Sequence, residues 1–146
     1  MSANAVAKKL GGRRVFRRDV TSDVQLIEAI REGLPATALE SVFGEFTTLV
    51  GIQADLYRAV GKERTLQRKR DEGSDLSPGE SDRLARLARL LVRAEQVFTD
   101  REKAHRWLAA PNRALGGLRP ISLLDSDAGS LAVERILGRI EHGVFS

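Results

Sequence analysis

The chain has 146 residues and a formal net charge of +4, with 42% hydrophobic residues, 30% charged residues and no cysteine. This composition is typical of a soluble globular protein and excludes a disordered chain, a disulfide framework and a zinc site built from thiolates. No apolar run approaches the roughly 20 residues that span a bilayer, and the amino-terminal residues lack the apolar core of a secretory signal. We therefore expect a cytoplasmic protein with no membrane association.

Basic residues dominate the first 20 positions. Those that precede the first acidic residue, Asp19, are Lys8, Lys9, Arg13, Arg14, Arg17 and Arg18. A block of like charges is usually solvated and mobile, and it can also attract nucleic acid. We expect residues 1–20 to form a flexible arm, and both interpretations of its charge stay open.

The rest of the chain has apolar residues at intervals of three and four, and no useful stretch alternates as a β-strand would. This pattern predicts an all-α fold. Ser22 and Gln25 have the spacing of a capping box, and Gly33 suits the end of a helix over residues 23–32. Pro35 suits the first turn of the next helix.

The segment 49–70 predicts two short helices joined by a tight turn at residues 60–62, within a helix-turn-helix region that we place at 21–76. Leu66 can anchor the second helix while polar side chains occupy the opposite arc. Arginine can form two hydrogen bonds with guanine and glutamine with adenine, whereas threonine or lysine can hold phosphates. The candidate DNA-binding residues are Arg64, Thr65, Gln67, Arg68, Lys69 and Arg70. An ordinary basic surface helix would show the same pattern.

A long connecting helix is expected over residues 77–98. Ser77, Pro78 and Glu80 supply an N-cap, a first-turn proline and the carboxylate of a capping box. The leucines that follow form a wide apolar stripe. The helix from Leu84 to Phe98 is also our first candidate for a dimer interface. A separate basic strip, expected to be solvated, consists of Arg86, Arg89 and Arg93.

Residues 99–146 hold the only tryptophan, Trp107. Thr99 and Glu102 repeat the capping-box spacing, and Ser126 can cap a final helix. We expect Trp107 to be the central plug of a small core. Its other members would be Leu108, Leu115, Ile136 and Ile140.

Residues that could perform chemistry are missing. His105 and His142 lie far apart in sequence, and neither has a neighbouring ligand cluster with metal-site spacing. Gly116 and Gly117 do not continue into a phosphate-binding motif. We expect no metal site, no cofactor and no catalytic residue.

The carboxyl-terminal third reads "VFTDREKAHRWLAAPNRALGGLRPISLLDSDAGSLAVERILGRIEHGVFS". This stretch resembles the toxin-binding region of Xre/ParS/MbcA-type antitoxins, which are partners of RES-domain toxins. "RTLQRKR" and "LSPGESDRLARLARL" extend the resemblance upstream. The residues that match the family pattern are Phe98, Asp100, Ala104, Trp107, Leu108, Pro111, Asn112, Leu115, Gly116, Gly117, Pro120, Leu123, Leu124, Gly129, Arg139, Ile140, Gly143 and Val144.

This resemblance implies an Xre-like helix-turn-helix bundle that binds its own operator, joined by the long helix to a toxin-binding domain at 99–146. The implied partner is a RES-domain toxin that degrades NAD, so NAD belongs to the toxin and the chain itself is not an enzyme. A homodimer is expected because paired operator half-sites mirror a two-fold axis.

The resemblance also implies that the final helix and tail cover the toxin's active site, through Arg139, Glu141, His142, Val144 and Phe145. For Val144 and Phe145, packing onto Trp107 is the alternative. A second hypothesis for the whole chain is a stand-alone transcriptional regulator whose carboxyl-terminal domain dimerises or binds an effector.

Overall fold

The computed structural model describes residues 2–47 and 49–143, and within them the fold is all-α, as predicted. Among these residues the β-type pairing is confined to one isolated bridge between Pro35 and Asp75. No helix in the described part of the chain is both long and apolar enough to cross a membrane. The helices are α1 (Ala3–Lys9), α2 (Arg13–Phe16), α3 (Asp23–Glu32), α4 (Thr37–Phe43), α5 (Gln53–Val60), α6 (Glu63–Glu72), α7 (Pro78–Phe98), α8 (Arg101–Ala109) and α9 (Asp127–Glu141), with 3-10 turns η1 (Gly44–Phe46), η2 (Arg113–Leu115) and η3 (Pro120–Leu123).

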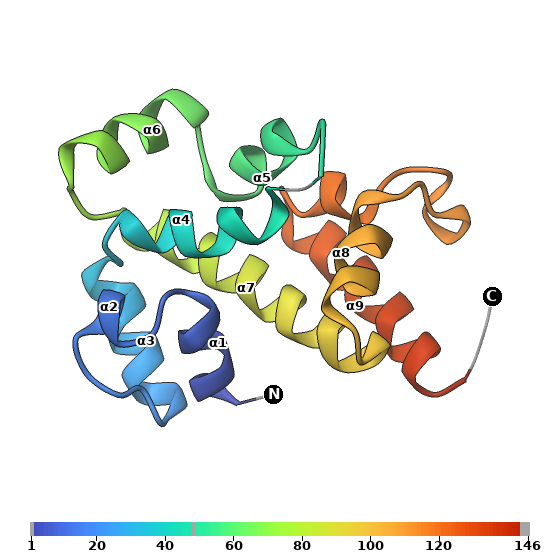
Figure 1. Ribbon diagram of the computed structural model, residues 1–146, viewed down its shortest axis with the longest axis horizontal. Helices are drawn as coiled ribbons and strands as arrows, with labels where there is room; N and C mark the ends of the chain where they lie inside the picture. Colours follow the sequence, from blue (N-terminus) through green and yellow to red (C-terminus); the bar gives the residue numbers. More distant parts are fainter. Residues whose placement is uncertain (1, 48, 144–146) are drawn as a thin grey trace.

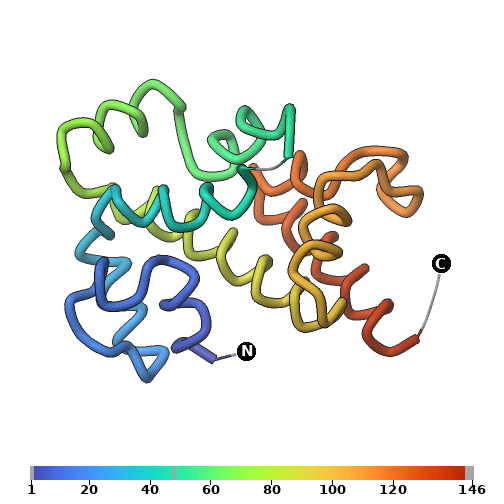
Figure 2. Tube along the Cα trace, viewed as in Figure 1, coloured from blue at the N-terminus to red at the C-terminus, as the bar shows by residue number. Residues whose placement is uncertain are grey.

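The predicted connecting helix, α7, is the centre of the fold. Its capping box is confirmed: the Ser77 hydroxyl accepts from the Glu80 amide at 3.1 Å, and the Glu80 carboxylate accepts from the Ser77 amide at 2.8 Å. Helices α1, α3, α5, α8 and α9 all pack against α7. Figures 1 and 2 show α7 running through the middle of the molecule, with α6 near its beginning.

The apolar stripe of α7 is used inside the chain. Leu84, Leu87 and Leu91 are at most 1% exposed because neighbouring helices cover this helix on several sides. A dimer contact through these leucines would require the monomer core to open. A dimer contact through α7 would therefore have to use its exposed side chains, such as Arg89 and Gln96.

The expected flexible arm is instead folded over residues 3–16, so that expectation is wrong. Ala3, Val6, Ala7 and Leu10 follow helical spacing and are buried, which gives α1 an apolar face against α7 and α3. This regular spacing outweighs the charge of the segment, because the basic side chains lie on the other faces of the helices.

The helix-turn-helix region contains the predicted elements. α3 covers the predicted residues 23–32, and the Ser22 and Gln25 capping box is present. α5 and α6 are joined at Gly61 and Lys62, and Leu66, which belongs to α6, is fully buried. Leu66 therefore fixes one face of α6 to the body, and the opposite face is available to solvent.

The carboxyl-terminal region begins with a different cap from the one expected. Asp100 caps α8, because its carboxylate accepts from the amides of Glu102 at 2.9 Å and Lys103 at 3.2 Å. Thr99 instead ends α7 with φ at 54°, so the Thr99 and Glu102 capping box is wrong. Ser126 caps α9 as predicted, accepting from the Gly129 amide at 3.0 Å.

Trp107 is not the central plug that the sequence suggested. Its ring is half-buried and lies 5.6 Å from the ring of Phe98, between centroids. Leu115 and Ile140 are also half-buried. Leu108 is fully buried and Ile136 is 8% exposed. Leu108, which follows Trp107 in α8, thus takes the interior position in place of the tryptophan, because it lies on the face of α8 that points toward α7.

Candidate DNA-binding and toxin-binding surfaces

The exposed face of α6 carries the side chains that could enter a DNA groove. Arg64 and Arg68 are exposed, and Thr65 and Gln67 are half-buried beside them. The Gln67 side-chain amide donates to the Glu63 carboxylate at 3.3 Å along the helix. The arginines project from a helix that Leu66 anchors, which is the arrangement that reading of base edges requires.

Lys69 has a structural role, and this corrects its assignment as a DNA-binding residue. Its ammonium donates to the Glu80 carboxylate at 2.6 Å, with the two side chains 19% and 10% exposed. Burial alone would raise the pKa of Glu80, but hydrogen bonds from Lys69 and Ser77 and the charge of Lys69 lower that pKa below its usual value of 4.5. The pair holds α6 against the beginning of α7. Arg70, which follows Lys69 in α6, is half-buried.

A second contact fixes the turn that precedes α6. The Arg83 side chain of α7 donates through Nε to the Val60 carbonyl at 2.6 Å, at the end of α5. Together with the Lys69–Glu80 pair, this bond sets the orientation of α6 relative to α7. Neither contact was expected from sequence, because each pair combines residues from different predicted helices.

The opposite end of the molecule carries the candidate toxin-binding residues. Arg139 and His142 are exposed at the end of α9, where they could contact a partner. Val144 and Phe145 lie outside the described residues. The carboxyl end of α9 is far from α6 along the longest axis of the molecule (Figure 1).

Glu141 is engaged within the chain. Both of its carboxylate oxygens accept from the Arg93 guanidinium of α7 at 2.7 Å. These hydrogen bonds lower the pKa of Glu141 and raise the pKa of Arg93. The structure therefore gives Glu141 the role of holding α9 on α7, with a side chain that is still 37% exposed.

The expected solvated strip on α7 is divided between two roles. Arg86 donates to the Leu124 carbonyl at 3.4 Å and lies 3.7 Å from the Asp127 carboxylate, at the start of α9. Arg93 holds the other end of α9 through Glu141. Arg89 alone of the three is exposed. The interpretation of this strip as solvated is thus wrong for Arg86 and Arg93.

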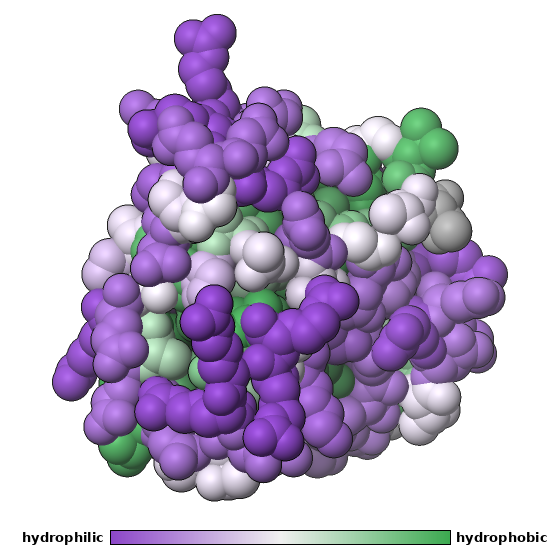
Figure 3. Space-filling model, turned by 60° about the vertical axis from the view of Figure 1, so that its left-hand side comes forward, coloured by the Kyte–Doolittle hydropathy of each residue, from purple (hydrophilic) through white to green (hydrophobic). Residues whose placement is uncertain are grey.

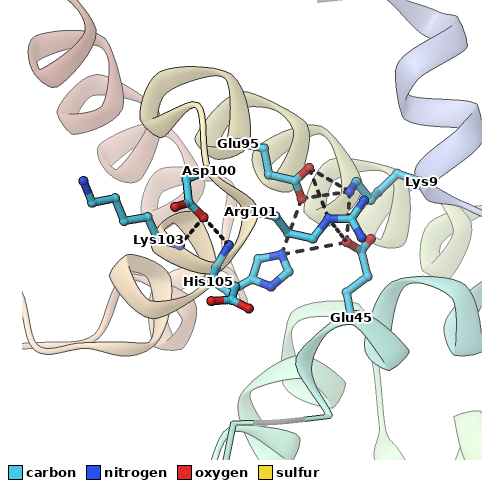
Figure 4. A network of polar contacts seen from close by, with 8 residues as sticks. Lys9, Glu45, Glu95, Asp100, Arg101, Lys103 and His105 are labelled. Atoms are coloured by element: carbon cyan, nitrogen blue, oxygen red, sulfur yellow. Dashed lines mark hydrogen bonds and ion pairs between the residues drawn. The ribbon is translucent and has the colours of Figure 1, made fainter.

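A polar network joins the amino-terminal helices to both other regions (Figure 4). The Lys9 ammonium lies between the carboxylates of Glu45 and Glu95, at 2.9 Å and 2.8 Å. Arg101 lies within 4.0 Å of the same two carboxylates. His105, expected to be structural or at the surface, is buried with Nε2 3.4 Å from Glu95, and its ring centroid is 4.9 Å from that of Phe46.

This network has the residue types of a metal site. Ligand atoms of Glu45, Glu95 and His105 all lie within 4.8 Å of one another. The Lys9 ammonium, however, already lies between the two carboxylates, and the Arg101 guanidinium supplies the second positive charge that balances them. The arrangement is therefore that of an internally neutralised ion-pair cluster.

Comparison with known proteins gives a family match for each half of the chain. The Antitoxin Xre-like helix-turn-helix domain matches residues 25–89. The Antitoxin Xre/MbcA/ParS C-terminal toxin-binding domain matches residues 93–143. Helices α1 and α2 precede both matched segments.

Relatives match across most of their length. A protein named Antitoxin Xre from Yersinia enterocolitica serotype O:8 / biotype 1B is 35% identical over 123 residues, covering 83% of this chain and 81% of the relative. An Antitoxin Xre from Photorhabdus laumondii subsp. laumondii is 34% identical over 128 residues, covering 86% of this chain and 84% of the relative. A protein of Sphingobium sp. (strain YBL2) named Prs ADP-ribosylating antitoxin is 30% identical over 134 residues, covering 86% of this chain and 83% of the relative.

Proposed function

Because the chain belongs to the Xre antitoxin family, with a helix-turn-helix domain and a toxin-binding domain, we propose that it neutralises a RES-domain toxin that degrades NAD and represses its own operon. The observation that carries this proposal is the match of the toxin-binding family over residues 93–143, which include all of α8 and α9. The chain acts by binding, and NAD is held by the toxin.

The toxin is inhibited, in this proposal, by coverage of its active site. The exposed end of α9, with Arg139 and His142, is the surface offered to the toxin. Arginine is common among residues that dominate binding energy at protein interfaces. The name of the Sphingobium relative, which joins antitoxin to ADP-ribosylation, supports a toxin whose chemistry uses NAD.

Operator binding is assigned to α6, with Arg64 and Arg68 reading base edges and Thr65 and Gln67 beside them. A homodimer would place one α6 on each operator half-site. Since the leucines of α7 are buried in the monomer, the dimer contact belongs to another surface. Contact with the operator places the protein in the cytoplasm.

The alternative is a stand-alone regulator whose carboxyl-terminal domain only dimerises or binds an effector. A helix-turn-helix alone would suit either function. The toxin-binding family match covers the domain on which the two hypotheses differ, and it favours the antitoxin.

Coexpression with the product of the neighbouring gene tests the proposal. We expect that gene to encode a RES-domain protein that lowers cellular NAD and stops growth when expressed alone. Coexpression of this chain should restore both, and the two proteins should copurify. Continued NAD loss with this chain present at equal or higher amounts would reject the antitoxin function for this pair.

A further inference from the structure

The two residues that follow helix α2 carry basic side chains that the fold does not use. Arg17 and Arg18 are exposed, and neither forms an ion pair with any residue in the described ranges 2–47 and 49–143. Arg13 lies 3.6 Å from Asp19, with both side chains more than 70% exposed, so it too stays largely solvated. Exposed cations with no internal partner are available to an anionic ligand.

These arginines are held by an ordered scaffold. Val15 is 5% exposed, and Gly11, with φ at +123°, permits the tight turn from α1 into α2. A methyl group at Gly11 would overlap the Val15 side chain, so the close return of α2 requires glycine there. Since the backbone is already ordered, binding through Arg17 and Arg18 would lose less entropy than binding through a mobile arm.

Helix α2 borders the place where α6 ends. A surface hollow of about 310 Å³ is lined by Phe16 and Arg18, and by Glu32, Pro35 and Asp75. Asp75 follows the end of α6 by three residues. Figure 3, which turns this end of the molecule toward the viewer, shows strongly hydrophilic side chains gathered over its upper and lower parts.

The partner that fits this position is the phosphate backbone of DNA. A duplex carries one negative charge per roughly 1.7 Å of its axis, so a surface beside a helix in the major groove meets phosphates. Arginine suits phosphate because its guanidinium donates two parallel hydrogen bonds.

We propose that Arg17 and Arg18 extend the DNA-binding surface beyond the helix-turn-helix, and that they hold the phosphate backbone beside the groove entered by α6. This inference rests on the proposed operator binding. It assigns a role to the α1–α2 pair, which lies outside both family matches.

Salt-dependent DNA binding of the Arg17→Ala/Arg18→Ala variant tests the inference. The probes are a duplex from immediately upstream of the gene and a random-sequence duplex of equal length. Loss of two phosphate contacts should lower the slope of log affinity against log salt by about 1.8 and weaken binding roughly tenfold or more on both probes. Toxin binding and thermal stability should match the wild type, because both side chains are exposed.

The matched control is Arg106→Ala/Arg135→Ala, which removes the same charge from exposed positions on α8 and α9. Its salt slope should equal that of the wild type. An unchanged slope in the α2 variant, an equal loss in the control, or a loss confined to toxin binding would overturn the inference while operator binding by the wild type stands. Failure of the wild type to bind either duplex would overturn operator binding and this inference together.

Discussion

Arg119 donates through Nη2 to the Asp55 carboxylate at 2.5 Å, between residues that are 64 positions apart in sequence. Asp55 lies in α5 of the helix-turn-helix region and is only 5% exposed, whereas Arg119 directly precedes η3 of the toxin-binding region. Arg119 also donates to the Gly51 carbonyl at 3.4 Å. The bond, together with the packing of α5 on η3, joins the two family-matched regions into one body.

Removal of Arg119 should destabilise the whole chain. In Arg119→Ala, the buried Asp55 carboxylate keeps, among the residues that the structure describes, only the Arg58 guanidinium at 3.4 Å, so its desolvation is poorly compensated. We expect the free energy of unfolding to fall by about 1–3 kcal/mol. The loss is smaller than for a fully buried ion pair, because the Arg119 side chain is 34% exposed and solvent screens its charge. Urea unfolding of the single variants and of the Asp55→Ala/Arg119→Ala double variant measures the coupling. Additive losses would contradict a direct interaction.

Acid should weaken the attachment of α6 to α7. The folded-state pKa of Glu80 is lowered, so its contribution is complete above its usual value of 4.5 and is lost as pH falls through the lower folded-state pKa. Unfolding free energies measured from about pH 6 to about pH 3 should therefore fall more steeply for the wild type than for Glu80→Gln. Near neutral pH, Glu80→Gln should have a lower free energy of unfolding than the wild type, and this difference should become smaller as the pH falls. A gap that stays constant would contradict this role for Glu80.

Gly129 should be required for the position of α9. A methyl group at Gly129 would overlap the Leu123 carbonyl oxygen, which is backbone and cannot move aside cheaply. Gly129→Ala should displace the beginning of α9 and weaken toxin binding, while DNA affinity changes little. Gly138→Ala on the same helix is the matched control, since nothing lies within 4 Å of its added methyl group. Alanine there should stabilise the protein by about 0.5–1 kcal/mol, and equal effects of the two substitutions would contradict the steric argument.

Arg64 and Arg68 should carry sequence preference in DNA binding. If each reads a base edge, Arg64→Ala or Arg68→Ala should weaken operator binding by about 1–3 kcal/mol and relax the preference at one base pair. Competition binding with single-base-pair operator variants measures both effects. An equal loss on operator and random duplexes would reassign the side chain to a phosphate contact.

Helix positions and caps were largely predictable from sequence, because their signals are local. Ser22 with Gln25 and Ser77 with Glu80 are three residues apart, and both capping boxes are present. The sequence alone does not distinguish Asp100 from the adjacent Thr99 as the cap, because Thr99 has the same capping chemistry three residues before Glu102. The choice between such neighbours depends on where the preceding helix ends.

The misassignments concern residues whose partners are distant in sequence. Lys69 belongs to a basic run in the sequence, but its Glu80 partner makes it structural. In residues 1–20, the helical spacing of Val6 and Leu10 packs α1 on the core, and this spacing determines the structure more than the charge of the segment does. Lys9 meets carboxylates 36 and 86 positions away, and no local pattern specifies such pairs.

The central claim is tested most directly by adding the purified chain to its purified toxin and measuring NAD consumption. The wild type should abolish consumption near a fixed molar ratio, and an Arg64→Ala/Arg68→Ala variant should do the same, because α6 is remote from α9. Arg139→Ala/His142→Ala, at the exposed end of α9, should require a clearly higher concentration. Undiminished NAD consumption at a large molar excess of the wild-type chain would contradict the account.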